Sequence, residues 1–251
     1  MLQPVVKETI TAVQIDYFTK EFPGYEIESK WFLSTQTPVL TMLQFLTDIE
    51  KGYWSPFRVQ KTMGSMPVGI RYLELDFHFF GKFENERWRQ VAMVAQIPGQ
   101  NRYQLAFKGG ENLLFADRML LSHPPFIRKE TRKGNWVSEE QMFQEIRIQE
   151  PNAKFVGTTT RIKCSVYITN AQSYRNFNLS ADLCHSKGCY PLSQIEVEYK
   201  GRSGIWLPDR TGAEILKEFS FFNCIMENHY RNISEPTLET KFRWIFGRTN
   251  K

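Results

Sequence analysis

YEIESKWFL, from Tyr25 to Leu33, is the stretch of sequence that decides the fold. In a β-strand, successive side chains point to opposite faces of the sheet, so Glu26, Glu28 and Lys30 share one face. The other face of the same strand is as apolar as that of a core strand. Since the apolar face requires burial, the charged face is the feature that needs an explanation.

The length and composition predict one large domain. A chain of 251 residues, of which 41% are hydrophobic and 14% aromatic, can bury a single large core. We therefore expect residues 1–251 to form one domain. The net charge is +5, from 32 basic and 27 acidic residues, and no run of Lys and Arg dominates. This balance argues against an extended nucleic-acid surface and suits a small polyanionic ligand.

The cysteines and the hydrophobic segments indicate the class of protein. Cys164, Cys184, Cys189 and Cys224 lack the spacing of zinc ligands, so we expect reduced structural thiols. No charged-then-apolar signal segment begins the sequence, and no stretch approaches the roughly 20 apolar residues of a membrane helix. We therefore expect a soluble, cytoplasmic protein without membrane contact.

Four segments with helical periodicity surround a β-rich centre. They cover residues 4–20, 37–51, 138–149 and 211–230. Ser138 is the predicted N-cap of the third helix, whose first turn carries Glu139 and Glu140. We expect the N-terminal helix and the helical segment 211–251 to be decorations on the outside of the core.

Period-two patterns predict an antiparallel meander. The first long strand covers residues 71–83, and Leu73, Leu75 and Phe77 lie on its apolar face. The remaining strands are predicted from Arg87 onward and over residues 103–108, 161–168, 175–183 and 194–200.

Several of these strands carry charged residues two positions apart. The pairs are Arg87 and Arg89, Arg128 and Glu130, Arg161 and Lys163, and Glu196 and Glu198, while Lys108 and Asp182 lie at strand ends. Each strand taken singly fits a half-solvated sheet. Together, the separation of basic pairs from carboxylate pairs indicates a binding site. The alternative is a β-rich interaction domain in which the order of charges is accidental.

The ordered charges resemble those of the CYTH family, also called triphosphate tunnel metalloenzymes. That family has Glu-x-Glu-x-Lys on its first strand, followed by Arg-x-Arg, Lys-Gly, Arg-x-Glu, a basic strand, a strand ending in Asp, and Glu-x-Glu. The resemblance covers roughly residues 25–200. It departs from the family pattern in the 25 residues that precede Glu26, in a helix inserted between Lys30 and Arg87, and in Pro124 and Pro125 before Arg128.

The resemblance implies an α+β fold that is mainly antiparallel β. Its core would be a closed or nearly closed eight-stranded tunnel barrel with a charged lumen and peripheral helices. Mg²⁺ or Mn²⁺ would be held by Glu26, Glu28, Asp182, Glu196 and Glu198. The phosphates would be bound by Lys30, Arg87, Arg89, Lys108, Arg128, Arg161 and Lys163. The catalytic residues would be Lys30, Glu28 and Glu130.

The first functional expectation is a divalent-metal-dependent hydrolase of an inorganic, nucleoside or other organic triphosphate. The second is an adenylate cyclase that makes cyclic AMP from ATP, and the third is a lumen that binds a nucleotide or polyphosphate without turnover. A small-molecule triphosphate or nucleotide is the expected partner, and an RNA 5′-triphosphate end is less favoured. The oligomeric state is left open.

Overall fold

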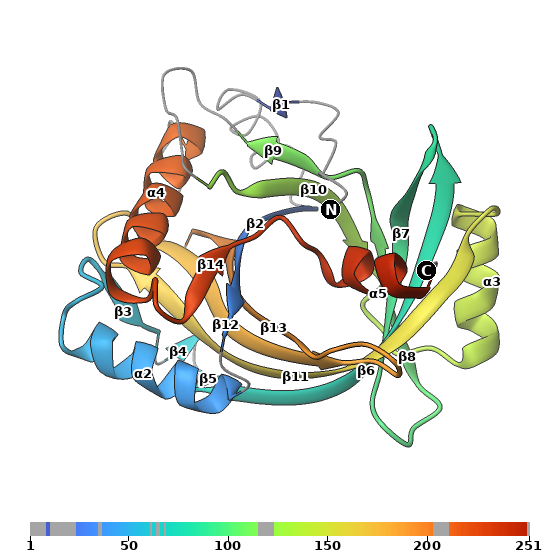
Figure 1. Cartoon of the computed structure of the whole chain (residues 1–251), viewed down its shortest axis with the longest axis horizontal. Coiled ribbons are helices and arrows are strands. Elements are labelled where there is room, and N and C mark those ends of the chain that lie inside the picture. The colour runs from blue at the N-terminus through green and yellow to red at the C-terminus, as the bar shows by residue number, and fades with distance from the viewer. Residues whose placement is uncertain are drawn as a thin grey trace.

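An antiparallel β-sheet that closes on itself is the centre of the molecule (Figure 1). The computed structural model describes residues 9–10, 24–34, 37–60, 62–63, 66–67, 69–114, 123–202 and 211–249. Around the barrel the strands are β2 (Tyr25–Leu33), β10 (Phe126–Arg132), β8 (Tyr103–Lys108), β7 (Arg87–Gln96), β6 (Arg71–Glu84), β11 (Lys154–Asn170), β12 (Arg175–His185) and β13 (Leu192–Arg202). The ring closes because β2 pairs with both β10 and β13. The predicted closed eight-stranded barrel is therefore confirmed.

Short strands extend this barrel at its margins. They are β1 (Thr9–Ile10), β3 (Phe57–Val59), β9 (Asn112–Leu114) and β14 (Ser234–Pro236), while β4 (Thr62–Met63) and β5 (Met66–Pro67) form a separate hairpin. The helix predicted over residues 4–20 is wrong at residues 9–10, because these pair with β9 in parallel. The rest of that segment lies outside the described residues.

The helices are α2 (Pro38–Glu50), α3 (Glu139–Gln149), α4 (Thr211–His229) and α5 (Lys241–Thr249). The first three confirm the helical periods found in the sequence. Ser138 caps α3 as predicted: its hydroxyl accepts a hydrogen bond from the Gln141 backbone, and the Gln141 side chain accepts one from Ser138 N. None of the described helices is long and apolar enough to span a membrane.

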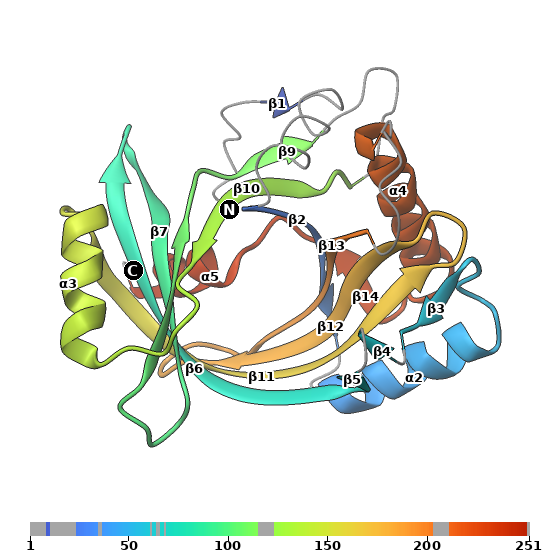
Figure 2. The same cartoon turned by 180° about the vertical axis from the view of Figure 1, so that it is seen from behind.

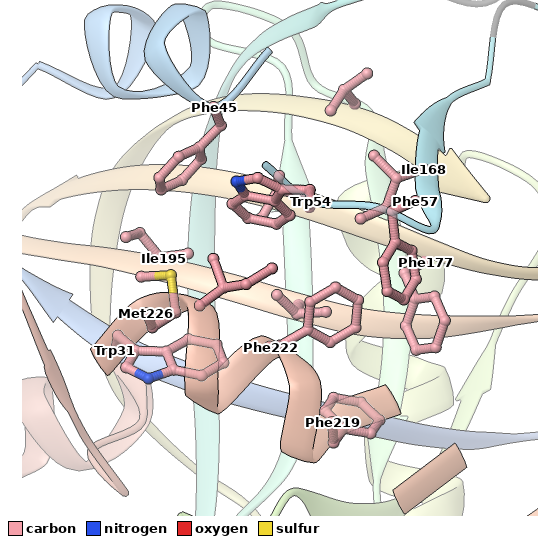
Figure 3. Close-up of a cluster of buried hydrophobic side chains, with 14 of the residues drawn as sticks. Trp31, Phe45, Trp54, Phe57, Ile168, Phe177, Ile195, Phe219, Phe222 and Met226 are labelled. Carbon is pink, nitrogen blue, oxygen red and sulfur yellow. The ribbon is translucent and has the colours of Figure 1, made fainter. Parts of the chain in front are cut away.

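The largest hydrophobic cluster lies between the barrel and the helices α2 and α4 (Figure 3). Trp31 of β2 is buried here with Phe45 of α2 and with Phe219 and Phe222 of α4. Full burial of one such side chain contributes roughly 1.5–3 kcal/mol relative to exposure. The apolar face of β2 therefore points outward, and this leaves Glu26, Glu28 and Lys30 on the lumenal face.

A second outer cluster lies beneath α3, where Met142 and Ile146 pack on Val94 of β7 and Leu105 of β8. Because α2, α3 and α4 all cover the outside of the barrel, they are peripheral, as expected.

Helix α5 differs, because it packs against the lumenal face at one end of the barrel (Figures 1 and 2). Phe242 and Ile245 are buried there with Phe77. Two glycines permit the close approach: a Cβ atom on Gly81 would lie 2.7 Å from the Phe242 ring, and one on Gly157 would lie 2.8 Å from Ile245. The C-terminal segment is therefore not wholly an outer decoration.

Candidate functional site

Charged side chains fill the lumen beside β2. Glu26, Glu28 and Lys30 are only 8%, 4% and 3% exposed. Directly opposed residues in antiparallel strands share a face, so Arg128 of β10 lies beside Glu26, and Glu198 of β13 lies beside Glu28. The predicted meeting of the first and last strands is confirmed by this register.

Glu26 is the centre of one buried ion-pair network. Arg128 Nε donates to Glu26 Oε2 at 2.6 Å, and Lys108 Nζ donates to the same oxygen at 3.0 Å. Burial by itself raises the pKa of Glu26, but Arg128 and Lys108 hold it well below its usual range. Lys108 also pairs with Glu130. Burial and then the neighbouring Arg128 lower the pKa of Lys108 to about 8.

Glu196 is the centre of a second buried network. Its carboxylate pairs with Lys30 at 3.1 Å, with Arg161 at 2.8 Å and with Lys241 of α5 at 2.5 Å. Asp182 pairs with the same Arg161 and with Lys241, the latter at 3.0 Å. Burial opposes the ionisation of Glu196, but Lys241 and Lys30 hold its pKa well below the usual value.

Glu28 lies between the two networks and behaves differently. It pairs with Lys30 at 2.8 Å and with Arg128 at 3.3 Å. Nevertheless, burial and then the neighbouring Glu26 raise its pKa above the usual value. Glu28 is therefore easier to protonate than Glu26 or Glu196.

A cavity of about 540 Å³ opens beside these networks. Its lining includes one carboxylate and five basic side chains, which are Glu198 and Arg71, Arg132, Arg161, Lys163 and Lys200. Within the described part of the chain, Lys163 makes no ion pair, and burial followed by repulsion from Arg161 lowers its pKa. Arg71 lies over the Tyr167 ring at 4.2 Å. Arg132, Arg161 and Lys200 pair with carboxylates, so among the described residues the positive charges left without an ion pair at the cavity are those of Arg71 and Lys163.

The carboxylates expected to bind a metal are each paired with a basic residue. They are Glu26, Glu28, Asp182, Glu196 and Glu198, and the last of these pairs with Lys200. Across the described ranges, no three Asp, Glu, His or Cys residues form a group that could hold a metal ion. Since Mg²⁺ requires near-octahedral oxygen ligands, the residues as placed do not fit such an ion. Metal binding stays a prediction from the sequence.

Arg87 and Arg89 do not join the lumenal residues. The register of β6 and β7 shifts beside them, and the consecutive residues Val91 and Ala92 both lie in the outer cluster. Such a β-bulge reverses the facing of the residues that precede it along β7. Arg89 therefore pairs with Glu84 on the outer face of the hairpin, at 2.9 Å.

The structure brings together the other expected residues and adds some that sequence reasoning missed. Lys241 was missed because its only signal is a lysine at the start of a short aromatic helix. Arg132 and Lys200 continue the period-two patterns of β10 and β13, and that continuation is the signal that could have assigned them to the cavity.

No family model and no curated protein matches the chain. Among solved structures, the chain is similar to the S. pombe Pct1 RNA triphosphatase in complex with the Spt5 CTD, with 12% identity, 86% coverage of each chain and a TM-score of 0.37. It is also similar to the S. pombe Pct1 RNA triphosphatase structure described without that partner, with 11% identity, coverage of 86% of this chain and 87% of that one, and a TM-score of 0.35. TM-scores this low carry no argument about function.

Proposed function

We propose that the lumen binds the phosphate chain of a triphosphate and that the protein is a triphosphate hydrolase. The observation that supports this is the cavity with five basic side chains and one carboxylate. A triphosphate carries several negative charges, which Arg forks bind in pairs and Lys neutralises as a compact charge. Arg71 and Lys163 make no ion pair with a described residue, so their charge is available to a ligand, and Arg132, Arg161 and Lys200 keep further N–H donors beside their carboxylate partners.

In this proposal, Arg161 and Lys163 of β11 bind phosphoryl oxygens from one wall, and Lys200 of β13 and Arg132 of β10 bind them from neighbouring walls. Glu198, which borders the same cavity, orients a water molecule for in-line attack on the terminal phosphorus. The water oxygen forms a bond to phosphorus as the bond to the bridging oxygen breaks, the diphosphate portion departs with that oxygen, and the proton of the water passes to a phosphoryl oxygen of the products. The fixed cations then stabilise the charge that spreads over the phosphoryl oxygens.

The residues expected to be catalytic act in this proposal as positioning residues. Lys30 pairs with Glu196, which in turn holds Arg161 at the cavity. Glu130 accepts a hydrogen bond from Arg132 and so orients that guanidinium. Glu28 pairs with Lys30 and so helps to position the lysine that contacts Glu196. No step is assigned to Mg²⁺ or Mn²⁺, because the carboxylates as placed do not fit either ion.

Product analysis tests the proposed reaction. The purified protein is incubated with tripolyphosphate or ATP, each in the presence of EDTA, Mg²⁺ or Mn²⁺. Release of orthophosphate supports the hydrolase, whereas cyclic AMP with pyrophosphate would identify a cyclase. Binding without any product would identify a binding protein, and the absence of binding would refute the proposal. Release of phosphate only with a metal would show that the carboxylates rearrange around an ion.

A further inference from the structure

The two sides of the cavity differ in chemistry. The strands β11 and β13 contribute most of its charged residues, whereas β6 and β7 contribute Leu73, Leu75, Phe77, Met93 and Ala95, with Arg71 at the start of β6 as their one charged lining residue. The five apolar residues form what we call the apolar wall. The register places these residues on the lumenal face, because Leu75 is the neighbour of Arg161 on the adjacent strand β11 and Phe77 is the neighbour of Ala95 on the adjacent strand β7. One side of the cavity is therefore charged, and the other is largely hydrocarbon.

Inorganic triphosphate is charged along its whole length, so it does not complement a cavity with one charged and one apolar side. Phosphate oxygens held against hydrocarbon would lose their hydration without gaining hydrogen bonds, which is costly. The apolar character also extends to the opening of the cavity, where Ile70, Tyr72 and Leu73 are 46%, 58% and 46% exposed. Exposed apolar surface beside a basic cavity suits a ligand with an anionic part and an apolar part.

Gln104 of β8 indicates which kind of apolar group the ligand carries. It lies directly opposite Ala95 in the β7–β8 register and lines the same cavity. Its side-chain amide has no hydrogen-bond partner within the described ranges. An amide offers both a donor and an acceptor, which can pair with the edge of a planar heterocycle. A saturated alkyl group would leave both groups without partners.

We propose that the apolar wall and Gln104 form a nucleobase subsite, so that the ligand is a nucleoside triphosphate and not inorganic triphosphate. This inference rests on the proposed function. The base lies against Leu75, Met93 and Ala95, its polar edge faces Gln104, and the phosphates reach the basic residues across the cavity. The volume of about 540 Å³ falls within the roughly 300–1,000 Å³ of small-molecule sites.

Affinities of the whole chain for three ligands test this subsite. Dissociation constants for ATP, UTP and tripolyphosphate are measured by calorimetry at one ionic strength. Tripolyphosphate has the higher charge density, so electrostatics alone would favour it. We expect at least one nucleotide to bind about tenfold more tightly, which is the lower end of the roughly 10- to 200-fold effect of a group in an apolar pocket. Equal or weaker binding of both nucleotides, with tripolyphosphate still bound, would overturn the subsite and leave the proposed function standing.

Variants distinguish the contribution of the nucleobase subsite to affinity from that of the basic residues. Met93→Ala and Gln104→Ala should each weaken nucleotide binding about fivefold or more while changing tripolyphosphate binding less than about twofold. Leu40→Ala, at a 63% exposed position on α2, is the matched control and should change neither affinity. An equal loss for both ligands in the two subsite variants would overturn the assignment. If neither ligand class binds the wild-type protein, the subsite and the proposed function both fail.

A further arm of the experiment distinguishes the source of the nucleotide. A short RNA with a 5′-triphosphate presents the same base and phosphates as a free nucleotide. Tighter binding of the RNA than of ATP and UTP would identify an RNA end, and tighter binding of a free nucleotide would identify a small molecule. Either result supports the base subsite, provided that the bound species exceeds tripolyphosphate in affinity.

Discussion

Replacement of Lys163 by Met is the sharpest test of the role of the basic residues that line the cavity. Lys163 lies on the lumenal face of β11 and lines the cavity, and it makes no ion pair with any described residue. Methionine retains much of the length of the side chain and removes its charge. The substitution therefore probes the affinity for phosphate without breaking an existing ion pair.

The structure sets the expected size and sign of the effects of Lys163→Met. A hydrogen bond to a charged group contributes about 1.5–3 kcal/mol, which corresponds to an increase of about 10- to 150-fold in the Kd for tripolyphosphate. Burial and the neighbouring Arg161 lower the pKa of Lys163, so its charge is disfavoured in the ligand-free fold. The free energy of unfolding should therefore stay constant or rise.

Calorimetry with tripolyphosphate measures the affinity, and urea denaturation measures the stability. The matched control is Lys129→Met, because Lys129 is an exposed lysine on a strand of the same barrel. An affinity of Lys163→Met within about twofold of the wild-type value would refute the assigned role. A loss of more than about 1 kcal/mol in unfolding free energy would refute the argument that its charge is unfavourable in the ligand-free protein.

Three further predictions concern the buried networks and the hairpin. Glu196→Gln should lose about 3–5 kcal/mol of unfolding free energy at neutral pH, whereas Glu28→Gln should stay within about 1 kcal/mol, because the pKa of Glu196 is lowered and that of Glu28 is raised. Identical urea midpoints for the two variants at pH 7 would contradict this difference. The contribution of Glu196 to the free energy of unfolding should be lost as the pH drops below its unfolded pKa of 4.5. Lys241→Met should also destabilise the protein by about 3–5 kcal/mol, because it leaves Glu196 and Asp182 short of a cationic partner; an unchanged urea midpoint would show that its ion pairs are not needed. Arg89→Ala should leave tripolyphosphate binding unchanged, and a loss of about tenfold or more by calorimetry would place its guanidinium at the ligand.

Local patterns were sufficient to predict much of the barrel. The alternation in β2 fixes which residues share a face, and the clusters beneath α2 and α4 explain why the apolar face turns outward. The same reasoning correctly predicted that Glu196 and Glu198 lie beside Glu28 and Lys30. In each case, the period of the strand and the need to bury apolar area indicate the same arrangement.

The parts that could not be predicted depend on contacts between distant segments. The bulge at Val91 changes the facing of Arg89, and no residue in the Arg-x-Arg pattern signals that shift. The lumenal position of α5 depends on space left by Gly81 and Gly157, far away in the sequence. Helical periodicity predicts a helix but does not reveal which side of a closed sheet it will cover.

The position of α5 makes the two ends of the barrel unequal. The cavity adjoins the beginning of β6, near Ile70, whereas α5 packs on the lumenal face near Gly81, farther along the same strand. The helix therefore narrows the lumen at that end of the barrel. Under the proposed function, we expect a substrate to enter from the end near Ile70, so that its triphosphate reaches the basic residues from that side. We expect the products to leave by the same end.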